Sequence, residues 1–266
     1  MIIYPRAKLN LGLNIVEKRS DGYHNLETVF YPINIHDTLE VEPSDSLRLQ
    51  LYGVPLEGDV NENLVLKAWR LLNNDHPLPP VNIHLHKAIP SQAGMGGGSS
   101  DGAFMLRLLN ELFQLNLSNE ELIKKATLLG ADCPFFITDN PAYAEGIGEK
   151  LTPISLDLSL YHLLIVKPPI AVSTREAFAH ITPRATEIKC REIVQQDIRT
   201  WRELLKNDFE DSIFPQYPRL KEIKEQLYQQ GALYAAMSGS GSSLYGFFEK
   251  APKLLNAWND CYVKLL

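Results

Sequence analysis

The alternation of apolar and polar residues near the N-terminus predicts a β-hairpin. In residues 8–18, the even positions are mostly polar and the odd ones are the apolar Leu9, Leu11, Leu13 and Ile15, which is the two-residue period of a strand. Lys8 and Asn10 therefore share the polar face of that strand. An Asp-Gly pair at 21–22 is typical of a tight turn, and residues 26–34 read as the returning strand.

The rest of the chain mixes strand and helix patterns. We predict further strands at 46–51, 81–87, 142–148, 161–168 and after a second glycine loop, Ser238–Ser243. Helical spacing predicts helices at 61–74, 99–115, 118–130, 192–206, 219–230 and 252–265. The elements do not alternate strictly as β-α-β, so the fold class is α+β. A polar stretch near 152–157 suggests two domains, 1–155 and 156–266.

A glycine-rich stretch lies between a predicted strand and a predicted helix. Residues 89–103 hold five of the sixteen glycines, and Ser99, Ser100 and Asp101 are candidate N-caps of the helix that follows. Backbone N–H groups and a helix N-terminus at one place favour a phosphate site. A Walker A loop would need a lysine after Gly98, and the dinucleotide pattern would need an acidic residue that closes a second strand; neither is found. A flexible surface loop is the alternative.

Composition limits the class of protein. The chain has 266 residues, 45% of them hydrophobic and 22% charged, which is ordinary for a globular protein of one or two domains. The net charge of −6 disfavours nucleic-acid binding through a basic surface. Cys133, Cys190 and Cys261 are widely spaced and form no metal-type pair. We expect a cytoplasmic protein with reduced cysteines and no targeting segment or membrane anchor.

Three further features match phosphoryl-transfer chemistry. Lys8, Asp132 and the second glycine loop each have a plain structural explanation: a surface lysine, a turn residue and a simple β-turn. Phosphoryl transfer, however, needs a positive group and a carboxylate that orients the acceptor hydroxyl, beside backbone donors that hold the phosphates. Together with the glycine-rich stretch, these residues supply those parts.

Three ordered segments carry a family resemblance: "PRAKLNLGLNIVEKRSDGYHNLETVF", "IPSQAGMGGGSSDGA" with "LGADCPFF", and "MSGSGSSLYGFF". They resemble the motifs of the galactokinase, homoserine kinase, mevalonate kinase and phosphomevalonate kinase (GHMP) superfamily. More narrowly, "RSDGYHNLETVF" and "GGGSSDGA" resemble the kinases that act on 4-diphosphocytidyl-2-C-methyl-D-erythritol in the non-mevalonate isoprenoid route. The match extends from Pro5 to about Phe248. The chain departs from the family pattern at Ser91, Gln92, Ala93, Met95 and Gly102, which leaves the effect on ATP affinity open.

The resemblance implies a fold and a reaction. The N-terminal domain would be like the second domain of ribosomal protein S5, the C-terminal domain would be ferredoxin-like, and the substrate would lie between them. The γ-phosphoryl group of ATP, accompanied by Mg²⁺, would move to the 2-hydroxyl of the methylerythritol part. ATP would bind along a loop made of Pro90, Ser91, Gln92, Ala93, Gly94, Met95, Gly96, Gly97, Gly98, Ser99 and Ser100.

The resemblance also implies roles for single residues. Asp132 matches the catalytic aspartate, which accepts or orients the hydroxyl proton, and Lys8 matches the catalytic lysine, which keeps that aspartate ionised and offsets phosphoryl charge. His24 would hydrogen-bond the cytosine edge, and Tyr23 or Phe178 would stack on the base. The residues that would bind the substrate are Asn10, Tyr23, His24, Phe178, Gly239 and Ser240. No protein ligand of Mg²⁺ is implied, because the serine of sibling kinases aligns with glycine.

Two other functions remain open at this level. A sibling kinase for mevalonate or homoserine would use the same loop and base, but it needs no nucleobase pocket at Tyr23 and His24. A catalytically silent binding protein on the same scaffold, for example one that touches RNA, would not require both Lys8 and Asp132. We therefore expect a small-molecule substrate, no nucleic-acid or membrane partner, and a monomer or weak homodimer.

Overall fold

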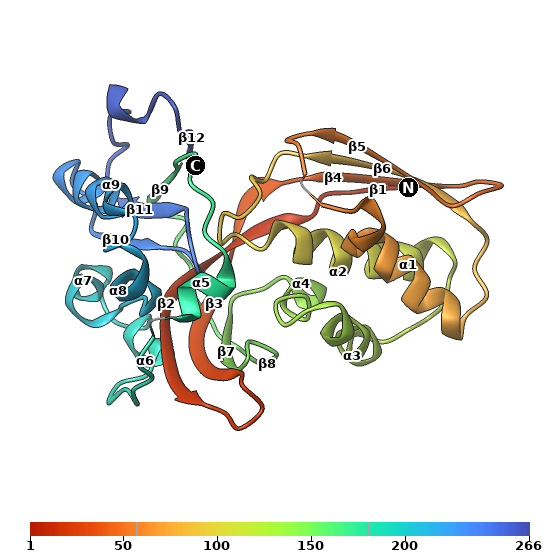
Figure 1. Cartoon of the computed structure of the whole chain (residues 1–266), viewed down its shortest axis with the longest axis horizontal. Helices are drawn as coiled ribbons and strands as arrows, with labels where there is room; N and C mark the ends of the chain where they lie inside the picture. Colours follow the sequence, from red (N-terminus) through yellow and green to blue (C-terminus); the bar gives the residue numbers. More distant parts are fainter. Residues whose placement is uncertain (57, 180) are drawn as a thin grey trace. The chain divides into compact units, whose positions relative to one another are not determined.

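The computed structural model describes residues 1–56, 58–179 and 181–266 (Figure 1). The chain forms two compact units and enters each of them more than once. Unit 1 contains Met1–Lys8, Pro32–Ser91 and Gly96–Asn140, and unit 2 contains Leu9–Tyr31, Gln92–Met95 and Pro141–Leu266. The domain boundary expected after residue 155 stays a prediction.

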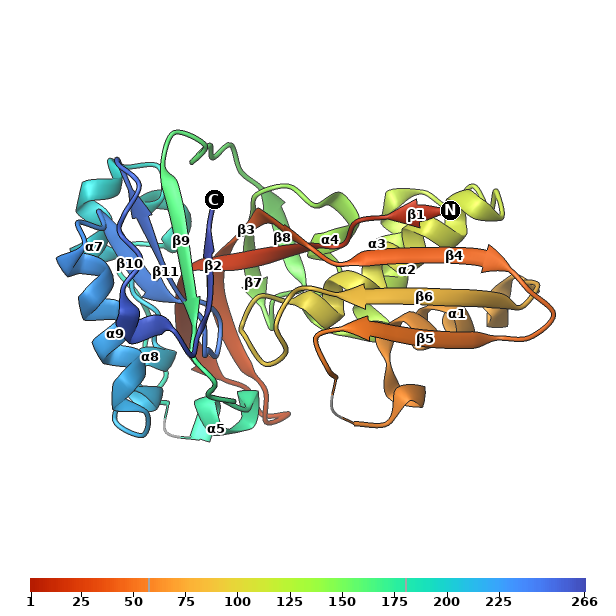
Figure 2. The same ribbon diagram turned by 90° about the horizontal axis from the view of Figure 1, so that it is seen from above.

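Unit 1 combines a sheet with a helical layer. The sheet has the order β1-β4-β6-β5, with β4 antiparallel and β5 parallel to β6. Figure 2 shows β4, β6 and β5 side by side, with α1 and α2 along one face, and α2 also packs on α3 and α4. The elements are β1 (Ile2–Ile3), β4 (Thr38–Pro43), β5 (Arg48–Gly53), β6 (Val81–Lys87), α1 (Leu64–Asp75), α2 (Gly97–Leu112), α3 (Asn119–Leu129) and α4 (Phe135–Thr138).

Unit 2 is built on an antiparallel sheet of order β10-β11-β9-β12, against which α9 packs (Figure 1). Its core is a cluster of buried side chains that includes Leu164, Val166, Ile223, Leu227 and Phe248. The elements are β7 (Ala142–Gly146), β8 (Lys150–Pro153), β9 (His162–Lys167), β10 (Tyr234–Met237), β11 (Leu244–Phe248), β12 (Tyr262–Leu265), α5 (Thr174–Ala179), α6 (Cys190–Ile193), α7 (Trp201–Leu204), α8 (Phe209–Ile213) and α9 (Pro218–Gln229).

The predicted hairpin is confirmed. Strands β2 (Arg6–Lys18) and β3 (His24–His36) are neighbours in a sheet of order β2-β3-β7-β8, and both contribute residues to the two units. Gly22 has φ of +86° at the turn between them, the conformation that glycine adopts at little cost. The strand is more buried than its polar pattern suggested, since Lys8 and Asn10 are both buried.

The helix that was best marked in the sequence also forms as expected. Ser118 is the N-cap of α3 and shares a full capping box with Glu121, and Gly130 is the C-cap. The predicted helix at 219–230 is confirmed as α9, and the mixture of interspersed strands and helices confirms the α+β class. None of the helices among the described residues is long and apolar enough to cross a membrane.

The helix predicted at 192–206 is wrong, because the chain breaks it in the middle. Helix α6 ends at Ile193, and a short 3₁₀ turn and α7 follow. The Asp197 side chain accepts a hydrogen bond from the Arg199 N–H at 2.9 Å and so starts a new turn. A side chain of this kind competes with the backbone for the N–H groups of a continuous helix.

The helix predicted at 252–265 is also wrong. The segment contains a short 3₁₀ turn, Asn256–Trp258, and then strand β12, which pairs antiparallel with β9. The segment forms a strand because it can pair with β9 at the edge of the sheet and because Tyr262 and Val263 favour strands. These two effects outweigh the helical spacing.

Candidate functional site

Lys8 and Asp132 form an ion pair in unit 1. The Nζ atom of Lys8 lies 3.2 Å from Oδ2 of Asp132, and the two side chains are 4% and 34% exposed. Lys8 is therefore no surface lysine, because a buried ammonium group requires a charged partner. Asp132 lies in the turn that follows the C-cap of α3, and its carboxylate keeps access to solvent. A buried cation thus holds an accessible carboxylate.

The start of α2 differs from the predicted one. The N-cap is Gly96 with φ of +70°, and the helix begins at Gly97. Ser99, Ser100 and Asp101 were expected as N-caps and lie inside the helix instead, because the left-handed conformation of Gly96 starts it earlier. The Ser100 N–H donates to the Gly96 carbonyl at 2.8 Å, so the N–H groups before it lie ahead of the first helical bond. These groups can bind an anion.

The space available for a side chain differs among the three glycines at the start of α2. A Cβ on Gly96 would lie 2.9 Å from the Phe136 ring and 3.2 Å from Cε of Lys8, and one on Gly97 would lie 2.9 Å from Ile89. A Cβ on Gly98 would have no neighbour within 4 Å. Protein atoms fill the space beside the first two glycines, whereas the space over Gly98 is open. Lys8 also lies next to this helix start.

The earlier part of the first glycine loop (Pro90–Ser100) is bound by the second one. In unit 2, the N–H groups of Ser242 and Ser243 each donate at 3.3 Å to the carbonyls of Gln92 and Ala93. The Ser238 hydroxyl donates to the Gly94 carbonyl at 2.8 Å. A Cβ on Gly94, where φ is +68°, would overlap the Ser238 carbonyl. The second glycine loop is therefore more than a β-turn, and Gly94 is needed for contact between two backbones.

This close approach gives a stability prediction. We expect Gly94→Ala to lower the free energy of unfolding by more than Gly22→Ala, the matched control. Both glycines have positive φ, where a non-glycine residue costs about 1–3 kcal/mol, but Gly22 has no neighbour within 4 Å. Urea unfolding monitored by circular dichroism measures both variants. Equal losses would mean that contact with Ser238 does not constrain Gly94.

Three of the predicted substrate-binding residues meet in unit 2. The Asn10 N–H donates to the Ser238 hydroxyl at 3.2 Å, and its side-chain amide donates to Thr28 at 3.1 Å. A Cβ on Gly239 would lie 3.2 Å from the Asn10 amide oxygen. The Ser240 hydroxyl lies 3.4 Å from that of Thr174, at the start of α5. The second glycine loop thus connects β2 with the helix that carries Phe178.

Two of the three predicted base-binding rings come together. The rings of His24 and Phe178 stack with centroids 4.9 Å apart and planes 17° apart, and Phe178 meets Phe209 edge-on. Burial and the nearby Lys18 lower the pKa of His24, which favours a neutral imidazole with one donor and one acceptor. Tyr23 lies at the turn and is 61% exposed.

Four further residues of the first glycine loop differ in burial. Ala93 and Met95 are buried. The Ser91 hydroxyl is buried and has no hydrogen-bond partner among the described residues, whereas Gln92 is exposed with φ of +48°. Any ligand of this loop would meet mainly backbone.

Sequence reasoning missed a buried cluster beside the helix start. Lys87 donates to Asp37 and, at 2.6 Å, to Asp101. A signal was available, because Lys87 continues the inward register of Val81, Ile83 and Leu85 on β6. A charged residue at a core-facing strand position indicates a buried partner.

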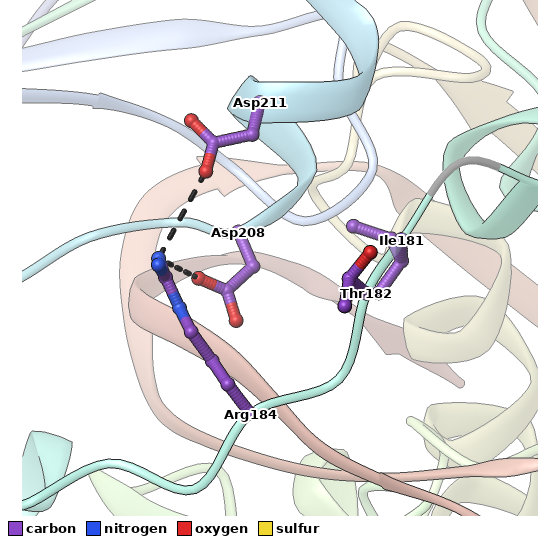
Figure 3. Close-up of a pocket in the computed structure, with 5 residues that line it drawn as sticks. All are labelled: Ile181, Thr182, Arg184, Asp208 and Asp211. Carbon is purple, nitrogen blue, oxygen red and sulfur yellow. Dashed lines mark hydrogen bonds and ion pairs between the residues drawn. The ribbon is translucent and has the colours of Figure 1, made fainter.

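An open pocket of about 240 Å³ in unit 2 is lined by Ile181, Thr182, Arg184, Asp208 and Asp211 (Figure 3). Arg184 lies 3.3 Å from Asp208 and 3.8 Å from Asp211. Asp208 also accepts a hydrogen bond from the Ile15 N–H at 2.8 Å. These contacts attach residues 181–184 to β2, and no predicted site residue lines the pocket.

Known proteins resemble the chain over nearly its full length. Residues 63–140 match the model of the GHMP kinases N terminal domain, and residues 190–264 match that of the GHMP kinases C terminal. The chain is 56% identical over 253 residues to a 4-diphosphocytidyl-2-C-methyl-D-erythritol kinase of Bacteroides thetaiotaomicron, with 94% of this chain and 92% of the relative covered. The corresponding protein of Chlorobium limicola is 42% identical over 252 residues, with 92% and 87% covered.

Solved structures also resemble the chain over its full length. A crystal structure of 4-(cytidine 5'-diphospho)-2C-methyl-D-erythritol kinase matches with a TM-score of 0.81 and 31% identity, covering 100% of this chain and 98% of that one. The mevalonate kinase of Methanococcus jannaschii matches with a TM-score of 0.70 at 15% identity, covering 100% and 97%, and shares the fold.

Proposed function

The chain belongs to the GHMP kinases and, within them, to the 4-diphosphocytidyl-2-C-methyl-D-erythritol kinases, and we propose that it transfers the γ-phosphoryl group of ATP to the 2-hydroxyl of 4-(cytidine 5'-diphospho)-2-C-methyl-D-erythritol. This step belongs to isoprenoid precursor biosynthesis by the non-mevalonate route. The cytoplasmic location, the absence of nucleic-acid partners and the monomer or weak homodimer stay predictions.

The ion pair between Lys8 and Asp132 beside the start of α2 carries the proposal. It puts a cation and an accessible carboxylate next to a helix N-terminus that has an open space over Gly98. A kinase for a small alcohol needs these groups together: donors for phosphate, positive charge for the transferred group and a carboxylate for the hydroxyl.

In the proposed transfer, one bond to the γ-phosphorus forms and one breaks. The substrate oxygen forms a bond to the γ-phosphorus, the bond from that phosphorus to the bridging oxygen breaks, and ADP leaves. Asp132 accepts the hydroxyl proton or orients it during this step, and the ammonium group of Lys8 offsets negative charge on the phosphoryl oxygens. The N–H groups at the start of α2 hold the phosphates.

Magnesium fits this chemistry as the companion of ATP. Protein-bound Mg²⁺ commonly takes ligands from phosphate oxygens, waters and one or two carboxylates, and it neutralises phosphate charge. Within residues 1–56, 58–179 and 181–266, no group of three or more histidine, cysteine, aspartate or glutamate side chains could hold a metal ion. We propose Mg²⁺ bound with the nucleotide and assign no protein ligand to it.

We assign recognition of the cytosine to His24 and Phe178. Each ring is half-buried and has the other as a stacking neighbour, so a base can stack on this pair or enter it. The neutral imidazole of His24 can donate to or accept from a base edge. Tyr23 remains the alternative stacking ring, because its exposed side chain is adjacent in sequence.

Alanine variants test the assignment of the base. We expect Phe178→Ala and His24→Ala each to raise the KM for the cytidine substrate about tenfold or more, since stacking on a base contributes about 1–3 kcal/mol. The KM for ATP is the internal control and should change little. Tyr23→Ala, measured in the same way, decides which ring stacks. Unchanged KM values for the cytidine substrate in all three variants would refute the assignment.

Nucleotide competition tests the same site without a mutation. CMP and CDP should inhibit competitively against the cytidine substrate and not against ATP. UMP should inhibit more weakly, because an unmatched base edge leaves buried polar groups unpaired. Equal inhibition by UMP and CMP, or none by either, would contradict a cytosine site.

A substrate panel tests the function itself. ADP release is measured with the purified chain, ATP, Mg²⁺ and, side by side, 4-diphosphocytidyl-2-C-methyl-D-erythritol, mevalonate and homoserine. We expect turnover with the first compound alone. Faster turnover with mevalonate or homoserine would make this a sibling kinase, and no turnover with any of them would point to a silent binding protein.

A further inference from the structure

A buried ion-pair cluster in unit 1 joins the two ends of the first glycine loop. Lys87 is the last residue of β6, and only Ala88 and Ile89 separate it from the loop, whereas Asp101 lies in α2, immediately after the loop. Asp37, between β3 and β4, completes the cluster. All three side chains are at most 3% exposed.

The contacts of the cluster fix the backbone on both sides of the loop. One carboxylate oxygen of Asp37 accepts hydrogen bonds from the N–H groups of Ala88 at 2.6 Å and Ile89 at 2.9 Å, and the other accepts from Lys87. Lys87 then donates to Asp101 at 2.6 Å. A Cβ added to Gly97 would lie 3.4 Å from Nζ of Lys87. The cluster therefore holds the backbone before and after the loop in one fixed arrangement.

We propose that Lys87 and Asp101 are positioning residues for the phosphates of ATP, an inference that rests on the proposed kinase function. They hold the first turn of α2 against the end of β6, so that its N–H groups keep the spacing that phosphate oxygens need. Burying one ammonium and two carboxyl groups is costly, and an apolar trio of similar size would often be at least as stable. The charged cluster instead fixes the geometry of the backbone at the loop.

The charge of the cluster supports a pH-dependent readout. Its charged groups are Lys87 from β6, Asp37 from the β3–β4 connection and Asp101 from α2. Burial raises the pKa of Asp101 to about 8, with Lys87 opposing the shift and Asp37 adding to it. With Asp101 protonated, the cluster carries no net charge. Above pH 8 it gains a negative charge beside the helix start, which should weaken the binding of ATP.

The first experiment compares three variants by titration calorimetry with ATP and Mg²⁺, together with the steady-state KM and kcat. Asp101→Ala removes the acceptor for Lys87, Asp101→Asn keeps an oxygen acceptor, and the exposed Glu111→Gln on the same helix is the matched control. We expect Asp101→Ala to weaken ATP binding tenfold or more with little change in the KM for the cytidine substrate. Asp101→Asn should restore most of the affinity at pH 7, and Glu111→Gln should behave as the parent.

The outcomes separate this inference from the proposed function. A parent protein that binds no ATP would refute the function, whereas a folded Asp101→Ala protein with parental ATP affinity would refute the positioning role. If Asp101→Ala does not fold, the pH dependence decides: the parental affinity should fall between pH 7 and pH 9, and that of Asp101→Asn should stay flatter. The same fall in both would overturn the inference.

Discussion

Asp132→Asn should lower kcat by roughly 10²–10⁴-fold, the range expected when general-base assistance is lost. Asparagine keeps the size of the side chain but removes the charge that faces Lys8 across 3.2 Å and the site that would accept the hydroxyl proton. Binding of ATP should persist, because the N–H groups of α2 do not depend on Asp132. Steady-state assays with saturating ATP and the cytidine substrate measure the effect.

Lys8→Ala should lower kcat by a comparable factor, since it removes the other half of the pair. The pair between Lys125 and the exposed Asp75, also in unit 1, provides the control: Asp75→Asn should leave kcat unchanged. Turnover of the Asp132→Asn protein within a few-fold of the parent would remove this aspartate from the mechanism.

Gly98→Val should raise the KM for ATP about tenfold to hundredfold. Hydrogen bonds to charged groups contribute about 1.5–3 kcal/mol each, and a branched side chain at this position would keep the phosphates from the N–H groups. A Cβ at Gly98 meets no protein atom within 4 Å, so the variant should fold. Gly97→Val is a poorer test, because its side chain would collide with Ile89.

Glu120→Val is the matched control for Gly98→Val. Glu120 is the second residue of α3, as Gly98 is of α2, and it is exposed. Both variants place valine in the first turn of a helix in unit 1, and the control should keep the KM for ATP. A parental KM in the Gly98→Val protein would mean that phosphate does not bind over Gly98.

The sequence predicted the elements that have strong local signals. Helix α3 has a capping box and a glycine stop, and the first hairpin has clear alternation and an Asp-Gly turn. The helices expected at 192–206 and 252–265 failed because a local cap at Asp197 and pairing of β12 with β9 override helical spacing. Such tertiary effects leave little trace in a short window of sequence.

The candidate site was predictable in part for similar reasons. Lys8 and Asp132 were found because their residue types suit the chemistry and their motifs resemble a family, not because any spacing brings them together. The need for glycine at position 94 was not predictable, because Ser238, whose backbone lies against Gly94, is far along the chain. Lys87 could have been found from its inward register on β6.

Phosphorus NMR of the product tests the central claim most directly. In the proposed substrate, carbon 2 bears the methyl group and no hydrogen, so a phosphomonoester at the 2-hydroxyl has no proton three bonds from phosphorus. We predict that ATP and the cytidine substrate give one new phosphomonoester signal that stays a singlet without proton decoupling. A signal split by protons would place the phosphate on another hydroxyl, and the absence of a new phosphomonoester would contradict phosphoryl transfer to this substrate.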